Sequence, residues 1–441
     1  MKVKMTLFLC FFTIHFIVGQ AWQISPVANA PEPITNNAVV EGVVNGTTTY
    51  IYTFGGLDST KLYSGIHLRS YRYNTLTNVW DTIAPLPDTL GKIAAAASRV
   101  KDKIYIIGGY HVYANGSEAS SDKVHIYDVN TNAYLLDGAN IPIPIDDQVQ
   151  AVWRDSLIYV ITGWTNSGNS PAVQIYNPSS NSWQSGTSVG NNNIFKSFGA
   201  SGTIIGDTIY YFGGASMAGS FNVQTYFRRG IIDPNNPTQI NWSSFTWMNA
   251  KGYRMAATTV LGDVFWLGGA AITYNYNGIA YNGSGGVAPT GRSLLYRKSN
   301  HSFEVEYGYD LPMDLRGIGN VSDTVKYLVG GMKAGQQVST ETLRLVLNPD
   351  SVLTNNTKLA MPLPISFKAV PNPAHQSLTI KIEQLPQQLE YQLMTTAGVC
   401  LRKGRIYKEE TKLDLTGLVA GVYYVQLVGE HKLGGQLVVI E

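Results

Sequence analysis

The stretch Ile209-Tyr-Tyr-Phe-Gly-Gly214 decides the fold, because variants of it recur along the whole first part of the chain. Each copy is a short apolar strand rich in aromatic residues that ends in Gly-Gly, or once in Thr-Gly. The six copies occupy residues 50–56, 104–109, 158–163, 209–214, 264–269 and 325–331. Their period of roughly 53 residues is typical of architectures built from repeated units, each too small to bury a core alone.

A second signal follows the glycine doublet in most units. An apolar strand ends in Tyr, turn-forming residues follow, and another aromatic residue stands seven positions after the Tyr. The pairs are Tyr73/Trp80, Tyr127/Tyr134, Tyr176/Trp183 and Tyr296/Phe303. The fourth unit departs from this spacing, since Asp233-Pro-Asn-Asn-Pro237 lengthens the turn before Trp242. This spacing predicts a hairpin in each unit, and therefore four antiparallel strands per unit.

The glycine doublet followed by Tyr and Trp at these offsets resembles the kelch repeat over about residues 20–350. The resemblance implies an all-β fold, a six-bladed kelch-type β-propeller. The sixth unit supplies a third strand at residues 342–347 but no clear fourth strand, whereas Ala21-Trp-Gln-Ile-Ser-Pro26 has the form of an isolated fourth strand. We therefore expect the N-terminal strand to complete the last blade and to close the ring, which leaves no free sheet edge.

The first nineteen residues predict a secretory signal peptide. Lys2 and Lys4 precede an apolar run from Met5 to Val18, which is too short to span a bilayer as a helix, and cleavage is expected just before Gln20. Of the two cysteines, Cys10 lies in this leader and only Cys400 remains. The mature chain is thus expected to hold neither an intramolecular disulfide nor a thiolate metal cluster.

From about residue 348 the pattern changes. Residues 348–366 are turn-rich and are interpreted as a linker, and residues 367–441 show short strands separated by glycine turns, which predicts a small β-sandwich. The box Pro371-Asn-Pro-Ala374, the motif Leu418-Val-Ala-Gly-Val-Tyr423 and the apolar end 436–440 resemble the type A C-terminal sorting domain of the type IX secretion system of Bacteroidetes. This resemblance implies recognition by the outer-membrane secretion machinery, removal of the tail, and a mature protein that is secreted or displayed at the outer-membrane surface.

Composition limits the partners. The net charge is +2, from 32 Lys and Arg against 30 Asp and Glu, so nothing points to nucleic acid or a charged membrane surface. No stretch after the leader predicts a transmembrane segment, and no cofactor or metal is expected.

The candidate ligand site is the mouth of the propeller channel, because propellers usually bind where the entrances of the innermost strands converge. Counting back from each glycine doublet places six residues there: Asn37, Lys92, Asp147, Lys196, Arg254 and Arg316. Four cations with one carboxylate would suit a carboxylated or sulfated glycan. Trp164, Tyr110 and His111 follow glycine doublets and could stack on a sugar, although packing between blades explains them equally well.

Three enzyme classes are alternatives to a binding module. A copper oxidase of the galactose-oxidase type has a kelch propeller but needs a cross-linked Tyr–Cys cofactor, and the predicted propeller contains no cysteine. Hydrolase motifs are absent from the sequence. A sialic-acid mutarotase of the six-bladed kelch type stays open, with Asp147 or Asp314 beside Arg254 and Arg316 as acid–base groups. The sequence favours an exported propeller that binds glycan or protein, with this mutarotase or epimerase as the alternative.

Overall fold

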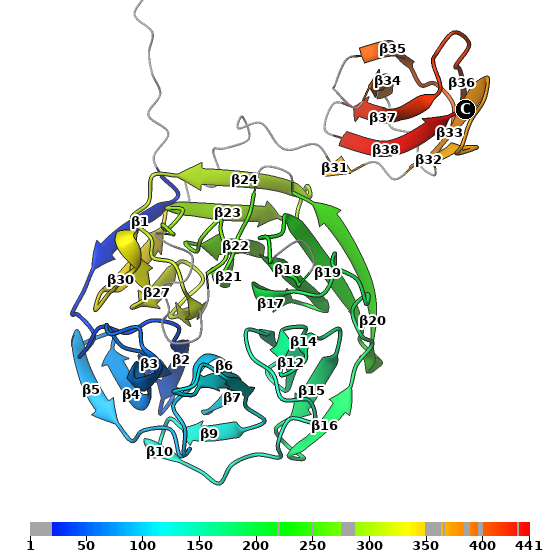
Figure 1. Cartoon of the computed structure of the whole chain (residues 1–441). Coiled ribbons are helices and arrows are strands. Elements are labelled where there is room, and N and C mark those ends of the chain that lie inside the picture. Colours follow the sequence, from blue (N-terminus) through cyan, green and yellow to red (C-terminus); the bar gives the residue numbers. More distant parts are fainter. Residues whose placement is uncertain are drawn as a thin grey trace, which may run out of the picture.

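The computed structural model describes residues 20–217, 221–247, 250–274, 287–348, 363–364, 367–382, 389–395, 400–429 and 432–441. The predicted leader, residues 1–19, and most of the predicted linker, residues 348–366, lie outside these residues. The described elements are strands apart from two short 3-10 helices, η1 (Tyr63–Gly65) and η2 (Ala334–Gln336). They form a ring of six blades and a separate small sandwich with its own core (Figure 1). The predicted all-β fold class is therefore confirmed.

Each blade is a four-stranded antiparallel sheet whose first strand lies next to the central channel. The first blade consists of β2 (Ala38–Val44), β3 (Thr48–Leu57), β4 (Ile66–Asn74) and β5 (Val79–Ile83). The second consists of β6 (Ile93–Val100), β7 (Lys103–Val112), β9 (Val124–Asp128) and β10 (Ala133–Tyr134). The third consists of β11 (Val149–Trp153), β12 (Leu157–Ile161), β15 (Val173–Asn177) and β16 (Ser182–Ser185). Short strands β8 (Glu118–Ser120), β13 (Trp164–Thr165) and β14 (Gly168–Asn169) extend the loops of the second and third blades.

The other three blades follow the same plan. The fourth blade consists of β17 (Phe198–Ile205), β18 (Thr208–Ala215), β19 (Tyr226–Asp233) and β20 (Asn236–Thr246). The fifth consists of β21 (Ala256–Val260), β22 (Asp263–Leu267), β23 (Arg292–Arg297) and β24 (Ser302–Tyr307). The sixth consists of β26 (Gly319–Asn320), β27 (Val325–Val329), β30 (Thr342–Leu347) and β1 (Trp22–Pro26). β25 (Arg316–Gly317) pairs in parallel with β2, and β28 (Met332–Lys333) pairs with β29 (Gln337–Val338).

The repeated Tyr and Trp side chains have the same contacts in the first and third blades. Tyr73 lies directly opposite Trp80, and Tyr176 directly opposite Trp183. The Tyr73 hydroxyl donates to Asn78 Oδ1 at 2.7 Å, and that of Tyr176 donates to Asn181 Oδ1 at 2.6 Å. The indole N–H of Trp183 donates to the carbonyl of Ala139 at 2.7 Å. The motif therefore closes each hairpin and ties it to the preceding connection, which explains its recurrence.

The glycine doublets lie where a blade meets the start of the next. Gly213 has φ 70°, and a Cβ atom added there would lie 2.1 Å from the carbonyl oxygen of Gly252. Only a residue without a side chain accepts both this conformation and this close approach.

The N-terminal strand β1 closes the ring. It pairs antiparallel with β30, from Trp22 opposite Leu347 to Pro26 opposite Leu343. Trp22 is 1% exposed, packs edge-to-face on Phe265 at 5.3 Å, and donates its indole N–H to Ser293 Oγ at 3.2 Å. The backbone N–H of Ala21 donates to both carboxylate oxygens of Glu306, at 3.1 and 3.2 Å. The last blade is thus built from both ends of the repeat region.

The C-terminal domain is a sandwich of two sheets. One sheet has the order β31 (Leu363–Pro364), β38 (Lys432–Ile440), β37 (Gly421–Gly429), β34 (Leu389–Thr395) and β35 (Cys400–Arg405). The other has the order β32 (Phe367–Val370), β33 (Ser377–Ile382) and β36 (Glu410–Asp414). Between them lies a core of buried aliphatic side chains, among them Leu378, Leu393 and Val425.

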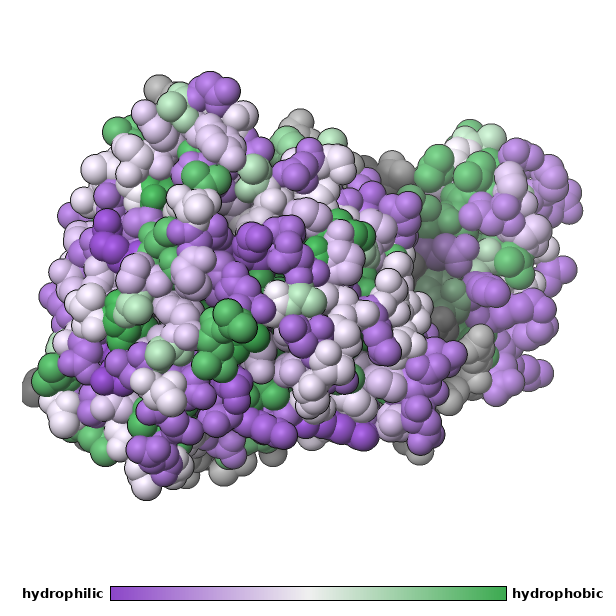
Figure 2. Space-filling view, turned by 90° about the horizontal axis from the view of Figure 1, so that it is seen from below, coloured by the Kyte–Doolittle hydropathy of each residue, from purple (hydrophilic) through white to green (hydrophobic). Residues whose placement is uncertain are grey.

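In the view from below, hydrophobic residues on the propeller lie in small groups among hydrophilic ones (Figure 2). Scattered exposed apolar residues of this kind are normal on soluble domains. Among the described residues no helix is long and apolar enough to cross a membrane.

Replacing Trp22 by Ala tests the role of β1. We expect the free energy of unfolding of the propeller to fall by about 3–5 kcal/mol, because a fully buried Trp is lost from the strand that closes the ring. Denaturant unfolding followed by tryptophan fluorescence measures this loss. Gln23→Ala is the matched control on the exposed side of the same strand, with an expected change within about 0.5 kcal/mol. Equal effects of the two substitutions would contradict this account of closure.

Candidate functional site

A closed circle of backbone hydrogen bonds fixes the end of the channel at which the innermost strands begin. One residue of each blade has a left-handed backbone there: Asn36, Ala94, Asp147, Gly199, Arg254 and Asp314, with φ between 48° and 65°. The N–H of each of the first five residues donates to the carbonyl of the corresponding residue in the preceding blade, at 2.8–3.3 Å. At the sixth position Leu315 donates to Arg254 at 3.0 Å. Every blade is thereby bonded to the next through its main chain.

Apolar side chains fill this end of the channel. Six bridging pairs, one from each blade, lie just before the circle: Thr35 and Leu57, Ile93 and Tyr110, Asp146 and Trp164, Phe198 and Ala215, Tyr253 and Ala270, and Met313 and Met332. Most belong to one buried cluster that also includes Tyr274 and Val287. The mouth that the sequence analysis considered as a ligand entrance is therefore packed with apolar residues.

A buried network of charges crosses the channel beneath this apolar cluster. Arg254 donates from Nε and Nη2 to the two carboxylate oxygens of Asp147, at 3.0 and 2.5 Å, and from Nη1 to Asp314 Oδ1 at 3.1 Å. Arg316 Nη1 lies 3.3 Å from Asp147 Oδ1. These four side chains are at most 7% exposed. The network links the third, fifth and sixth blades. Each of these buried charges needs its partner, because an unpaired buried ion is strongly destabilising.

Burial also shifts the ionisation of this network. Removal from solvent raises the pKa of Asp314 to about 6, although Arg254 acts in the opposite direction. Desolvation likewise lowers the pKa of Arg316, which Asp147 partly offsets. Asp314 is held by a hydrogen bond of 2.7 Å from Thr35 Oγ1. The network therefore contains a carboxyl group whose protonation changes near neutral pH.

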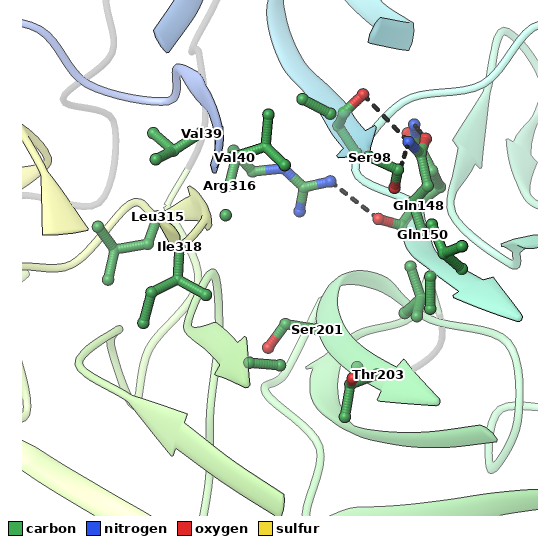
Figure 3. A pocket seen from close by; sticks show the side chains of 18 of the residues that line it. Val39, Val40, Ser98, Gln148, Gln150, Ser201, Thr203, Leu315, Arg316 and Ile318 are labelled. Atoms are coloured by element: carbon green, nitrogen blue, oxygen red, sulfur yellow. Dashed lines mark hydrogen bonds between the residues drawn. The ribbon is translucent and has the colours of Figure 1, made fainter. Parts of the chain in front are cut away.

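The rest of the channel contains a cavity of about 240 Å³. It is lined by the innermost strands of the blades, and the side chain of Arg316 reaches across it towards the third blade (Figure 3). Arg316 Nη2 donates to the carbonyl of Gln148 at 2.9 Å, and Gln150 Nε2 donates to Ser98 Oγ at 2.9 Å. The cavity thus has one cationic group at its inner end and neutral polar groups along one wall.

Three buried polar atoms on the cavity wall have no hydrogen-bond partner within the described part of the chain. They are Arg316 Nε, Gln148 Oε1 and Ser201 Oγ. A buried polar atom without a partner costs about 1–3 kcal/mol, so such atoms are expected to bind water or a ligand. Together they offer a charged donor, an acceptor and a hydroxyl.

The far end of the cavity has its own charged groups. Glu41 accepts hydrogen bonds from Arg99 Nε at 3.4 Å and from the backbone N–H of Asn320 at 2.9 Å. Lys326 on β27 is 2% exposed, and burial lowers its pKa to about 8, against the effect of Glu41. Ion pairing of Glu41 keeps this rim close to electrical balance.

The structure brings together three of the six candidate residues, Asp147, Arg254 and Arg316. The other three lie elsewhere. Lys92 belongs to a separate buried group, 2.6 Å from Asp88 and 3.0 Å from His125 Nε2. Asn37 Nδ2 donates to Thr53 Oγ1 at 2.7 Å, and Lys196 lies on the loop before Gly199.

In the second, fourth and fifth blades the circle residue lies 14 positions before the start of the glycine doublet, so Lys92 and Lys196 stand two and three positions too early. In the first and sixth blades a longer first hairpin places the circle residue 19 and 16 positions before the doublet. The residue that occupies the circle is Asn36 rather than Asn37, Ala94 rather than Lys92, Gly199 rather than Lys196 and Asp314 rather than Arg316. Gln148 and Ser201 were not found by sequence reasoning, since a neutral polar residue on an inner strand carries no distinguishing pattern.

The aromatic candidates do not form a flat exposed platform. Tyr110 is 3% exposed and belongs to the apolar cluster. Trp164 is half-buried, with edge-to-face contact to Phe198 at 5.2 Å, and His111 Nδ1 lies 2.8 Å from the carbonyl oxygen of Gly91. Packing accounts for these three side chains.

Comparison with known proteins identifies the tail. The family model described as a secretion system C-terminal sorting domain matches residues 368–441. The C-terminal domain is a type IX sorting domain. Its presence means that the chain is exported to the cell surface or the extracellular space, as predicted. Within the sorting domain, the motif residue Tyr423 is buried and its hydroxyl donates to the carbonyl of Val419 at 2.6 Å.

The propeller resembles known kelch proteins. Kelch-like protein 35 of Mus musculus is 29% identical over 136 residues, which are 30% of this chain and a fifth of that protein. The solved structure of YjhT superposes with a TM-score of 0.56 at 17% identity, over 72% of this chain and 96% of that one. A fungal alcohol oxidase in complex with copper gives a TM-score of 0.51 at 13% identity, over 96% of this chain and 100% of that chain. At these identities the two structures support the fold alone, and the predicted kelch propeller is confirmed.

Among the described residues, no group of three or more His, Cys, Asp or Glu side chains is arranged to hold a metal ion.

The buried amine of Lys326 predicts a specific pH dependence of stability. The unfolded chain keeps this proton up to about pH 10.5 and the folded chain releases it near pH 8, so the unfolded state binds more protons in between. The free energy of unfolding should therefore gain about 1–3 kcal/mol from Lys326 between pH 7.5 and 10. Lys326→Met removes this gain, which urea unfolding at the two pH values measures as a difference between the proteins. Parallel pH profiles for both would contradict the assignment.

Proposed function

We propose that this exported propeller is a binding module that takes an acidic sugar unit of a glycan into its channel cavity. The observation that carries the proposal is the inner end of the cavity, where Arg316 Nε, Gln148 Oε1 and Ser201 Oγ lie buried without partners. A guanidinium suits a carboxylate or sulfate, and the acceptor and hydroxyl suit sugar hydroxyl groups.

The size of the cavity supports a small ligand. Its volume of about 240 Å³ lies just below the range of about 300–1,000 Å³ typical of pockets for drug-sized molecules. Entry would have to occur from the rim with Glu41 and Arg99, since apolar side chains fill the other end. The ligand is therefore a single sugar or the end of a chain rather than the middle of a polymer.

Arg316→Gln tests this proposal. We expect the mature protein to bind an acidic glycan on an array, and the variant to bind it about 10- to 100-fold more weakly, because a hydrogen bond to a charged group contributes about 1.5–3 kcal/mol. Calorimetric titration with the acidic sugar and its neutral analogue measures the difference. Arg154→Ala, an exposed arginine paired with Asp207, is the matched control and should bind like the wild type. Equal affinity of the Arg316 variant would overturn the assignment.

A sugar mutarotase of the sialic-acid type is the second candidate. It is favoured by the convergence of Asp147 and Asp314 with Arg254 and Arg316 directly behind the cavity, and by a pKa of Asp314 near neutrality. The burial of both carboxylates and their pairing with Arg254 count against direct contact with a sugar.

The two candidates separate in one measurement. If the protein is a mutarotase, the exchange between the two anomers of sialic acid is accelerated at catalytic protein concentrations, which magnetisation-transfer NMR detects. A pure binding module leaves the exchange rate at its uncatalysed value while the sugar signals broaden. Arg316→Gln should abolish the acceleration in the first case and the broadening in the second.

A further inference from the structure

The sorting domain has one apolar sheet face that no described element covers. Side chains at alternate positions of β37 and β38 point away from the core: Val422 is 49% exposed, Leu437 58% and Val439 36%. Val422 pairs directly with Val439, and Tyr424 lies between Met394 of β34 and Leu437 of β38. The next row on the same face is polar, with Gln392 opposite Gln426. These five apolar side chains therefore form a bounded patch, here called the outer patch.

The adjacent sheet edge is closed by the box Pro371–Ala374. The side chain of Asn372 behaves like the backbone of an additional strand: its Nδ2 donates to the carbonyl of Leu437 at 3.0 Å, and its Oδ1 accepts from the N–H of Val439 at 2.8 Å. Ala374 continues the pairing, since its N–H donates to the Val439 carbonyl and its own carbonyl accepts from Glu441, both at 2.8 Å. At the other end of β38, Leu363 and Pro364 of β31 pair with Lys432 and Leu433.

The opposite edge of the sheet, β35, is unsuitable for another strand for a different reason. It carries Arg402, Lys403 and Arg405, and charged side chains on an edge strand oppose the addition of a further strand. Arg402 also bonds to the carbonyls of Asp414 and Thr416, which ties this edge to the second sheet. A protein that recognises this sheet through strand addition thus finds both edges blocked.

A partner nevertheless has to recognise this domain, because sorting domains act by being bound by the secretion machinery. The inner face of the sheet is buried against the second sheet, and the edges are closed. We propose that the secretion machinery binds the sorting domain through the outer patch, Met394, Val422, Tyr424, Leu437 and Val439. Asn372 is the positioning residue that keeps the edge of β38 closed beside the patch.

The test compares charged substitutions on the two halves of the same sheet face. Leu437→Lys or Tyr424→Lys in the full chain should reduce the surface-displayed and secreted protein at least tenfold in a host with a type IX system, with accumulation in the periplasm. Gln426→Lys, two residues from Tyr424 on the same strand and face, is the matched control and should be exported normally. Immunodetection on whole cells, in the medium and in the periplasm measures the three fractions.

Hydrogen exchange followed by mass spectrometry separates recognition from folding. A patch variant that keeps wild-type protection of β37 and β38 but fails in export supports the proposal. Should a lysine variant lose protection, the milder Leu437→Gln replaces it. Normal export of a folded patch variant overturns the proposal.

Variants of Asn372 test the positioning role. Asn372→Ala removes both side-chain hydrogen bonds to β38 and is expected to increase exchange at Val439 and to lower export. Asn372→Asp keeps the acceptor for the Val439 N–H but loses the donor to Leu437, so its exchange and export should lie between those of Asn372→Ala and the wild type. If Asn372→Ala changes neither exchange nor export, Asn372 has no positioning role.

Discussion

The circle of main-chain hydrogen bonds at the start of the innermost strands is the constraint on which the propeller depends. It requires six residues in the left-handed region, and five of them carry side chains, for which this conformation costs about 1–2 kcal/mol each. The arrangement persists because each N–H and C=O would otherwise be buried without a partner. Closing the circle fixes the distance between blades, and the apolar cluster then packs on a rigid base.

This base also explains why the two ends of the channel differ. Just before the circle, side chains from the six blades pack together, and most of them are apolar, so that end is filled. Farther along, the innermost strands carry small residues such as Ala96, Ala200 and Ser201, which leaves a cavity. The buried pair of Arg254 and Asp147 separates the two regions. The cavity is thereby confined to the open end, with Arg316 at its inner limit and Glu41 and Arg99 among its other lining residues.

Both domains close a sheet edge that would otherwise be exposed, but they do so with different groups. The propeller uses the N-terminal strand, which fills the open position of the last blade and anchors Trp22 in the core. The sorting domain uses a single side-chain amide, with Asn372 taking the place of a strand along β38. An exported chain benefits from closed edges, because unpaired strands promote association between molecules.

The sequence by itself determined the repeat, the strand count of the blades, the closing strand and the identity of the tail, because these follow from local patterns. A glycine doublet, a Tyr and Trp at fixed spacing, and the Pro-Asn-Pro-Ala box can each be read within a short stretch of sequence. It also suggested that Asp147, Arg254 and Arg316 lie near the channel. Which residues meet across the ring was decided only by the tertiary structure. A longer first hairpin in the first and sixth blades shifts the register there, so that Asn36 and Asp314 enter the circle rather than Asn37 and Arg316, while Lys92 and Lys196 lie just before it. The cavity and its unpaired Gln148 and Ser201 arise from the packing of six strands that are distant in sequence, and no pattern within any one of them records it.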